Sequence, residues 1–171
     1  MPIRVDVFTA GGTASGAAPG ATHLRDLLEG RTELALLDAS WRPNDGSAAR
    51  VVGDLTLAID DILVAIGDDD PTIPVHASWH EIQLAMGPYV VAGELPTLPG
   101  YDPGRALARP TGEFVLLRDV RMGWLDGPAG MTPLGGVAHV NRYGVDRVRA
   151  DIMLGFYFPG AALETPDVAQ A

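Results

Sequence analysis

An internal echo constrains the fold of this chain more than any other feature of its sequence. The run Glu-Phe-Val-Leu-Leu at residues 113–117 repeats the run Glu-Leu-Ala-Leu-Leu at residues 33–37. When the two glutamates are aligned, the Pro-Gly pair at residues 19–20 meets the Pro-Gly pair at residues 99–100. A repeated order of landmarks is the sequence signature of a duplicated structural unit. The chain is therefore predicted to contain one small module twice.

Small shifts of register extend the match between the two halves. Residues 15–16 (Ser-Gly) then correspond to residues 92–93 (Ala-Gly), and residues 38–39 (Asp-Ala) correspond to residues 119–120 (Asp-Val). The alternative is coincidence, because Pro-Gly and Leu-Leu recur easily in a chain that contains 21 Gly and 14 Pro. The conserved order of the landmarks along the chain favours duplication.

Each half contains short apolar runs that are separated by turn residues. Residues 5–8 alternate apolar and polar, which is typical of a half-buried strand. Residues 23–28 predict a short helix, because Leu24, Leu27 and Leu28 share one face at helical spacing. Short strands at this spacing indicate a β-sandwich or barrel, so we expect an all-β fold of two tandem small antiparallel β-barrel modules, each with at most one short helix. The predicted division is a first β module at residues 1–67, a linker at 68–79, a second module at 80–158 and a disordered tail at 159–171.

The charge and composition exclude several kinds of function. The formal net charge is −10 and all 12 basic residues are Arg. Sequence-independent affinity for nucleic acid comes mainly from basic residues that neutralise phosphates, so nucleic acid is a poor partner for this chain. The absence of Lys removes Schiff-base chemistry, and the absence of Cys removes thiolate nucleophiles and disulfides. No apolar run approaches the roughly 18 residues that span a membrane, so we expect no membrane partner and a cytoplasmic location.

Several short motifs resemble a small bacterial β-barrel domain family of unknown function. In the first half they are Arg-Asp-Leu-Leu at residues 25–28, Leu-Leu-Asp-Ala at 36–39 and Ile-Asp at 59–60; in the second half they are residues 116–120, with Arg118 as an insertion, and Val-Asn-Arg at 140–142. The order of elements is also coarsely similar to Sm-like barrels, which are bent five-stranded antiparallel sheets that often form rings. The resemblance implies a homo-oligomer.

The same resemblance points to one ligand-binding turn. Sm-like barrels bind RNA with a short basic and glycine-containing turn before the last strand, and Asn141, Arg142, Tyr143 and Gly144 occupy that place in the second half. The first half has Asp60 and Asp61 there, which would repel phosphate. A small-ligand or RNA-binding regulator that uses Asn141, Arg142 and Tyr143 is therefore the first alternative function.

Other residue patterns offer weaker chemistry. His76 and His80 are spaced as zinc ligands would be on a helix, and a metal-dependent enzyme that uses them is the second alternative; a structural role at the module interface is the competing interpretation. The glycine-rich residues 8–16 resemble a nucleotide-binding loop but lack Gly-x-Gly-x-x-Gly spacing and a Walker lysine. The three acids at residues 68–70 lack the alternation of a calcium loop.

These patterns together predict a non-catalytic protein that assembles with itself or with another protein. No catalytic residue and no cofactor is expected. Phe156 and Phe158 are core residues if they are buried, and they mark a partner surface if they are exposed.

Overall fold

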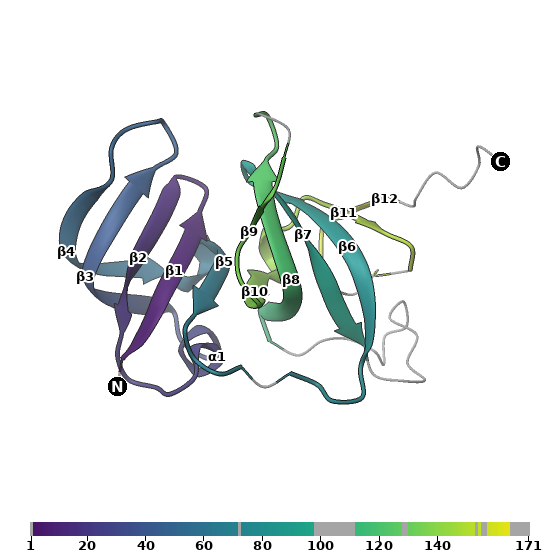
Figure 1. Ribbon diagram of the computed structural model, residues 1–171, viewed down its shortest axis with the longest axis horizontal. Helices are drawn as coiled ribbons and strands as arrows, with labels where there is room; N and C mark the ends of the chain where they lie inside the picture. Colours follow the sequence, from purple (N-terminus) through teal and green to yellow (C-terminus); the bar gives the residue numbers. More distant parts are fainter. Residues whose placement is uncertain are drawn as a thin grey trace.

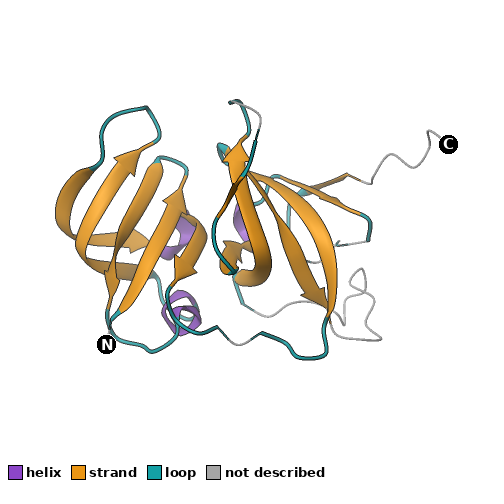
Figure 2. Ribbon diagram, in the orientation of Figure 1, coloured by secondary structure: helices purple, strands orange, loops and turns teal. Residues whose placement is uncertain are grey.

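A computed structural model describes residues 2–71, 73–97, 112–127, 130–152, 154 and 157–164. Strands dominate it, which confirms the predicted all-β class (Figures 1 and 2). The elements of the first half are β1 (Ile3–Thr9), β2 (Gly12–Ala18), α1 (Leu24–Leu28), β3 (Glu33–Pro43), β4 (Arg50–Ala58), the 3-10 turn η1 (Ile59–Asp61) and β5 (Ile62–Gly67). Those of the second half are β6 (Ser78–Met86), β7 (Tyr89–Thr97), β8 (Phe114–Trp124), β9 (Thr132–Pro133), β10 (Val137–Asn141), the 3-10 turn η3 (Arg142–Gly144), β11 (Arg147–Ala150) and β12 (Ala162–Glu164).

All twelve strands that the described residues form belong to one sheet. Its order is β12-β11-β6-β7-β8-β10-β5-β1-β2-β3-β4, with the short β9 paired to β8. The sheet is continuous and does not close on itself, whereas the sequence predicted two small barrels. If the short β9 and β12 are left aside, each half has five strands, β1–β5 in the first half and β6, β7, β8, β10 and β11 in the second. The two sets, β5-β1-β2-β3-β4 and β11-β6-β7-β8-β10, follow the same scheme, in which the last of the five strands pairs with the first.

The predicted boundaries differ from the elements in two places. β6 begins at Ser78, inside the predicted linker, because Ser78 and Trp79 pair with residues of β7. Residues 162–164 of the predicted disordered tail form β12, which runs parallel to β11. Among the described residues, no helix is long and apolar enough to cross a membrane.

The long strands β3 and β8 bend at matching bulges. Asp38 in β3 has φ 49° and Asp119 in β8 has φ 53°, and these are the only non-glycine residues with positive φ that the structure describes. A glycine of the neighbouring strand lies against each bulge: a Cβ on Gly16 would lie 3.0 Å from the Leu37 carbonyl oxygen, and a Cβ on Gly93 would lie 3.1 Å from the Arg118 carbonyl oxygen. The glycines therefore permit the close approach of backbones that the bends require.

This geometry corrects the alignment of the two halves. Gly16 lies against the Leu36 side chain, and Gly93 lies against the Leu117 side chain. Leu36 is therefore the counterpart of Leu117 and not of Leu116, and no residue is inserted at Arg118. The two aspartates lie at bulges within strands.

The apolar residues form two clusters that meet at β5. Leu63 and Val64 pack with the second half, whereas Ile62 and Ala65 pack with the first half. In return, Phe114 at the start of β8 packs with the first cluster, that of residues 3–65. Each half therefore completes the core of the other.

The glycine-rich residues after β1 form a hairpin and not a nucleotide loop. β1 and β2 pair directly, with Phe8 opposite Thr13. A side chain at Gly12 would collide with the Arg42 carbonyl and the Trp41 ring. A dinucleotide-binding loop joins a strand to a helix, and here a strand follows instead.

Candidate functional site: the junction of the two halves

The two halves join through a pair of buried strands. β5 of the first half and β10 of the second are antiparallel, with Ala65 opposite His139 and Val64 opposite Val140. All four residues are buried. Figure 1 shows both strands near the middle of the molecule. The junction is therefore a packed seam along these strands.

Asn141 ties the end of the seam to the turn that follows it. It is 3% exposed, and its side-chain amide donates a hydrogen bond to the Ile62 carbonyl oxygen at 2.9 Å. Its side-chain oxygen accepts a hydrogen bond from the Tyr143 N–H at 3.0 Å and so caps η3. Both polar atoms of the amide are thus used in holding the fold.

Arg142 is also held by the fold. Only 5% of the residue is exposed, its Nε donates to the Tyr157 carbonyl oxygen at 2.7 Å, and its Nη1 donates to the Gly112 carbonyl oxygen. Tyr143 is 60% exposed, with the Arg142 guanidinium 5.5 Å from its ring centroid. Ligand binding by residues 141–143 remains a prediction, but Asn141 and Arg142 already have structural partners.

A second set of contacts crosses the junction at the β6–β7 turn. The Tyr89 hydroxyl donates to the Thr9 carbonyl oxygen at 2.7 Å and accepts from the Asn44 side chain at 2.8 Å. The Tyr89 ring packs edge-on against Phe8, with 6.0 Å between centroids. Burial raises the pKa of Tyr89 above its usual value, so its hydroxyl stays protonated and can donate the hydrogen bond to the Thr9 carbonyl oxygen.

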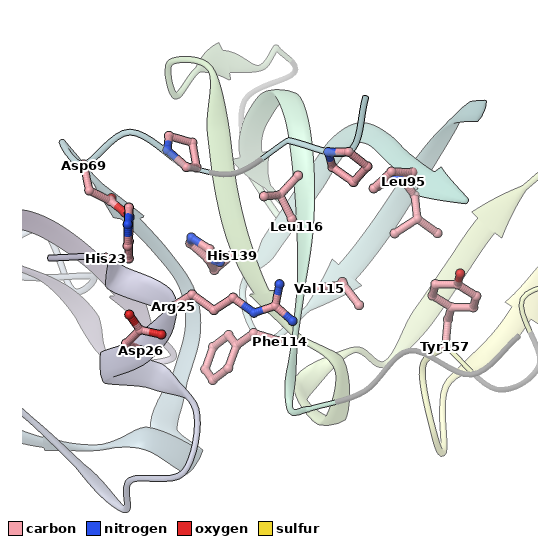
Figure 3. A pocket seen from close by; sticks show the side chains of 13 residues that line it. His23, Arg25, Asp26, Asp69, Leu95, Phe114, Val115, Leu116, His139 and Tyr157 are labelled. Carbon is pink, nitrogen blue, oxygen red and sulfur yellow. The ribbon is translucent and has the colours of Figure 1, made fainter. Parts of the chain in front are cut away.

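A cavity of about 580 Å³ opens beside the seam (Figure 3). We call it the junction cavity. α1 and the residues after β5 line one side, and β7, β8 and β10 line the other. Its polar residues are His23, Arg25, Asp26, Asp69 and His139, and its principal apolar residues are Leu95, Phe114, Val115, Leu116 and Tyr157.

His139 is the most deeply buried titratable group of the junction cavity. It is 6% exposed, and among the described residues no hydrogen bond or ion pair involves its ring. Burial lowers the pKa of His139 below its ordinary value; the negative charge of Asp69 opposes this shift and the positive charge of Arg25 adds to it. The ring is therefore neutral near pH 7 and presents one N–H donor and one nitrogen acceptor.

Asp69 holds the start of α1 in place at the junction cavity. Its side chain is 6% exposed, accepts a hydrogen bond from the Leu24 N–H at 3.0 Å and lies 3.8 Å from His23 Nδ1. Asp68 accepts from the Arg4 N–H at 2.8 Å. Two of the three consecutive acids therefore hold α1 and β1 in place, where the sequence predicted a solvated linker.

The histidines predicted as metal ligands do not form a cluster. His76 is exposed in the segment between β5 and β6, and His80 Nε2 lies 2.8 Å from the Thr97 hydroxyl. Within the described residues, no group of three or more His, Cys, Asp or Glu side chains is arranged to hold a metal ion. The adjacent Trp79 packs under the Arg118 guanidinium at 3.8 Å, and Arg118 also pairs with Glu94.

Of the two aromatic residues that the sequence offered for an interaction surface, the structure describes one. Phe158 is 1% exposed and packs in the cluster of the second half, so it is a core residue and not a surface one. Phe156 lies outside the described residues.

Sequence reasoning missed four residues of the junction cavity, namely His23, Arg25, Asp69 and His139. One signal was present, because His139 interrupts the apolar run Val-Ala-His-Val at residues 137–140. A polar residue within an apolar strand needs a partner when it is buried. Nothing in the sequence places α1 opposite that strand.

Comparisons with protein-family models, with curated proteins and with solved structures found no significant match.

Proposed function

We propose that this protein is a non-catalytic assembly protein, built from two Sm-like modules, whose copies join head to tail by strand pairing. The observation that carries the proposal is the β5–β10 pair, which joins the last strand of one half to the fourth strand of the other. A second copy can repeat this joint by pairing its β11 with β4. The resemblance to Sm-like barrels, which often form rings, agrees with such a joint.

The register of the proposed joint follows from the counterparts in the two halves. Leu36 pairs with Leu55, and its counterpart Leu117 pairs with Ala138. Leu55 and Ala138 are therefore counterparts, and so are the residues that follow them, Thr56 in β4 and His139 in β10. The register of the β5–β10 pair therefore predicts which residue of a second copy would lie opposite each residue of β4.

The partner strand is aligned in the same way. Val5 pairs with both Gly16 and Gly67, and Ile82 pairs with both Gly93 and Ala150. Because Gly16 and Gly93 are counterparts, Gly67 corresponds to Ala150, and Ala65 corresponds to Val148. Since Ala65 lies opposite His139, the proposed joint places Val148 of one copy opposite Thr56 of the next.

The exposed edge of β4 is suited to this pairing. Among the described residues, β4 pairs with β3 alone, and Val51 on it is 83% exposed. An unpaired strand edge is a template for another strand.

β12 covers the β11 edge that the joint requires. It has three residues, all exposed, and pairs with β11 so that Leu163 lies opposite Val148. A strand of three exposed residues buries little apolar surface and separates at low cost. β12 is therefore a displaceable cover that limits assembly.

Light scattering after size-exclusion chromatography, over a hundredfold range of concentration, tests the proposal on the full chain and on a chain that ends at Ala161. The full chain should associate weakly, and the shortened chain should form larger oligomers at the same concentration. A shortened chain that remains monomeric at every concentration overturns the proposal.

Thr56→Lys in the shortened chain tests the edge itself. Lysine on an edge strand opposes pairing with a further strand, so this variant should be monomeric. Ala35→Lys is the matched control, because Ala35 is exposed and lies opposite Thr56, one strand in from the edge. Equal loss of association in both variants would show that added charge, and not the β4 edge, is responsible.

A further inference from the structure

The junction cavity has the dimensions and lining of a small-molecule site. Its volume of about 580 Å³ lies within the range of roughly 300–1,000 Å³ that is typical of ligand sites. Such sites combine an apolar lining with a few convergent polar groups. Here Leu95, Val115 and Leu116 supply apolar surface, and the polar groups gather on the side of α1 and β10.

His139 provides independent evidence for a ligand. The ring nitrogens of His139 are not among the buried side-chain atoms without a hydrogen-bond partner, so they open onto the cavity, where a ligand can reach them. The residue is 6% exposed, and its ring has no partner among the described residues. The His139 ring projects into the junction cavity in Figure 3. A ligand atom in the cavity would complete its hydrogen bonding.

Arg25 indicates the chemistry of that ligand. Figure 3 shows its guanidinium reaching from α1 across the cavity toward Phe114 and Val115. Within the described residues, no carboxylate forms an ion pair with Arg25, whereas Asp69 is engaged by the start of α1. A guanidinium beside an N–H donor matches the two oxygens of a carboxylate.

We propose that the junction cavity binds a small amphipathic monocarboxylate, with its carboxylate between Arg25 and His139 and its apolar body against Leu95, Val115 and Tyr157. His139 donates its N–H to one carboxylate oxygen, and Arg25 neutralises the charge. The cavity shares no residue with β4 or β11, so ligand binding and head-to-tail assembly fail or succeed separately.

Isothermal titration of the full chain with octanoate, octanol and octylamine tests the head group at constant chain length. Octanoate should bind with the highest affinity, octanol more weakly, and octylamine least. Highest affinity for octylamine would overturn the carboxylate assignment. Absence of binding by all three compounds would overturn the site.

Arg25→Gln tests the location of the site. The change should weaken octanoate binding about tenfold, because a hydrogen bond to a charged group is lost, while octanol binding stays unchanged. Arg31→Gln is the matched control, since Arg31 is exposed and lies outside the cavity lining. Equal weakening by both variants would show a general charge effect and overturn the role of Arg25.

His139→Thr tests the hydrogen bond from His139 to the carboxylate. Threonine is chosen because Thr56 is the counterpart of His139 in the first half. Octanoate should bind several-fold more weakly to this variant. In the unaltered protein, the imidazole nuclear magnetic resonance signals of His139 should shift on addition of octanoate, with little change for His76. Signals of His139 that do not respond to saturating octanoate would exclude the contact.

Discussion

The two halves of the molecule share a bend and differ in what surrounds their fourth strand. In both, an aspartate with positive φ bends the third strand against a glycine of the second strand. β4 then lies at the edge of the sheet, whereas β10 is enclosed between β8 and β5. A single backbone design thus serves as a free edge in one place and as an internal strand in another. The difference arises from side chains and neighbours and not from the local fold.

The side chains of the fourth strands record this difference. Thr56 and Ala58 of β4 are exposed, whereas their counterparts His139 and Asn141 are buried. Asn141 bonds across the seam to Ile62, while Ala58 precedes η1 with no side-chain cap. Of these two fourth strands, only the one with a partner strand carries a polar side chain that bonds across to the other half.

The largest expected effect tests whether the two bends are equivalent. Gly16→Val and Gly93→Val should each lower the free energy of unfolding by about 3 kcal/mol, because the new side chain meets backbone that cannot withdraw without straightening the bend. Urea denaturation of the two variants measures both losses. Gly136→Ala is the control, since a Cβ there would meet nothing within 4 Å. Strongly unequal losses would break the comparison of the two halves.

An intermediate effect tests the seam. Asn141→Ala should lower the free energy of unfolding by about 2 kcal/mol, because it leaves the buried Ile62 carbonyl without its donor and removes a cap. The reciprocal change Ala58→Asn should be nearly neutral, since no partner strand lies beside β4. Urea denaturation of both variants checks this asymmetry. Similar losses in the two variants would show that the turns, and not the seam, determine the effect.

The smallest effect concerns pH. Because burial lowers the pKa of His139 in the folded protein, the unfolded chain takes up this proton near pH 6.5 while the folded chain does not. His139 therefore contributes stability above its unfolded pKa, and that contribution is lost as the pH falls below it. Denaturation at pH 7.5 and 5.5 should show a smaller loss for His139→Thr than for the unaltered chain.

The groups that face His139 set the control for this experiment. Asp69 favours its protonation and Arg25 opposes it, and the half-exposed His23 lies beside Asp69. His23→Gln should retain the acid sensitivity that His139 causes. An unaltered pH dependence in His139→Thr would refute the assignment.

Much of the fold could be predicted because it follows from local patterns. The alternation at residues 5–8, the helical spacing of Leu24, Leu27 and Leu28, and the echo at Glu33 and Glu113 are all readable from neighbouring residues. The error at Leu116 arose because sequence alignment matches letters, whereas the bulge fixes which leucine meets the glycine. A positive φ at Asp38 leaves no trace that distinguishes it from a turn.

The candidate site was less accessible to prediction because it depends on long-range pairing. Asp69 lies far from the β10 strand in sequence, and the two meet only because β5 pairs with β10. Arg142 read as an exposed basic turn, since nothing local shows that the carbonyl groups of Gly112 and Tyr157 would enclose it. Burial of an ionisable group is a property of the assembled chain.

The division of β5 between the two apolar clusters has a consequence for how the molecule melts. Adjacent residues of this one strand complete two cores, so loosening either core withdraws support from the other. The halves of a duplicated chain are often independent folding units, but here neither is whole alone. Thermal unfolding should thus be a single cooperative transition. A chain cut after Gly67 would yield two fragments that fold only when both are present.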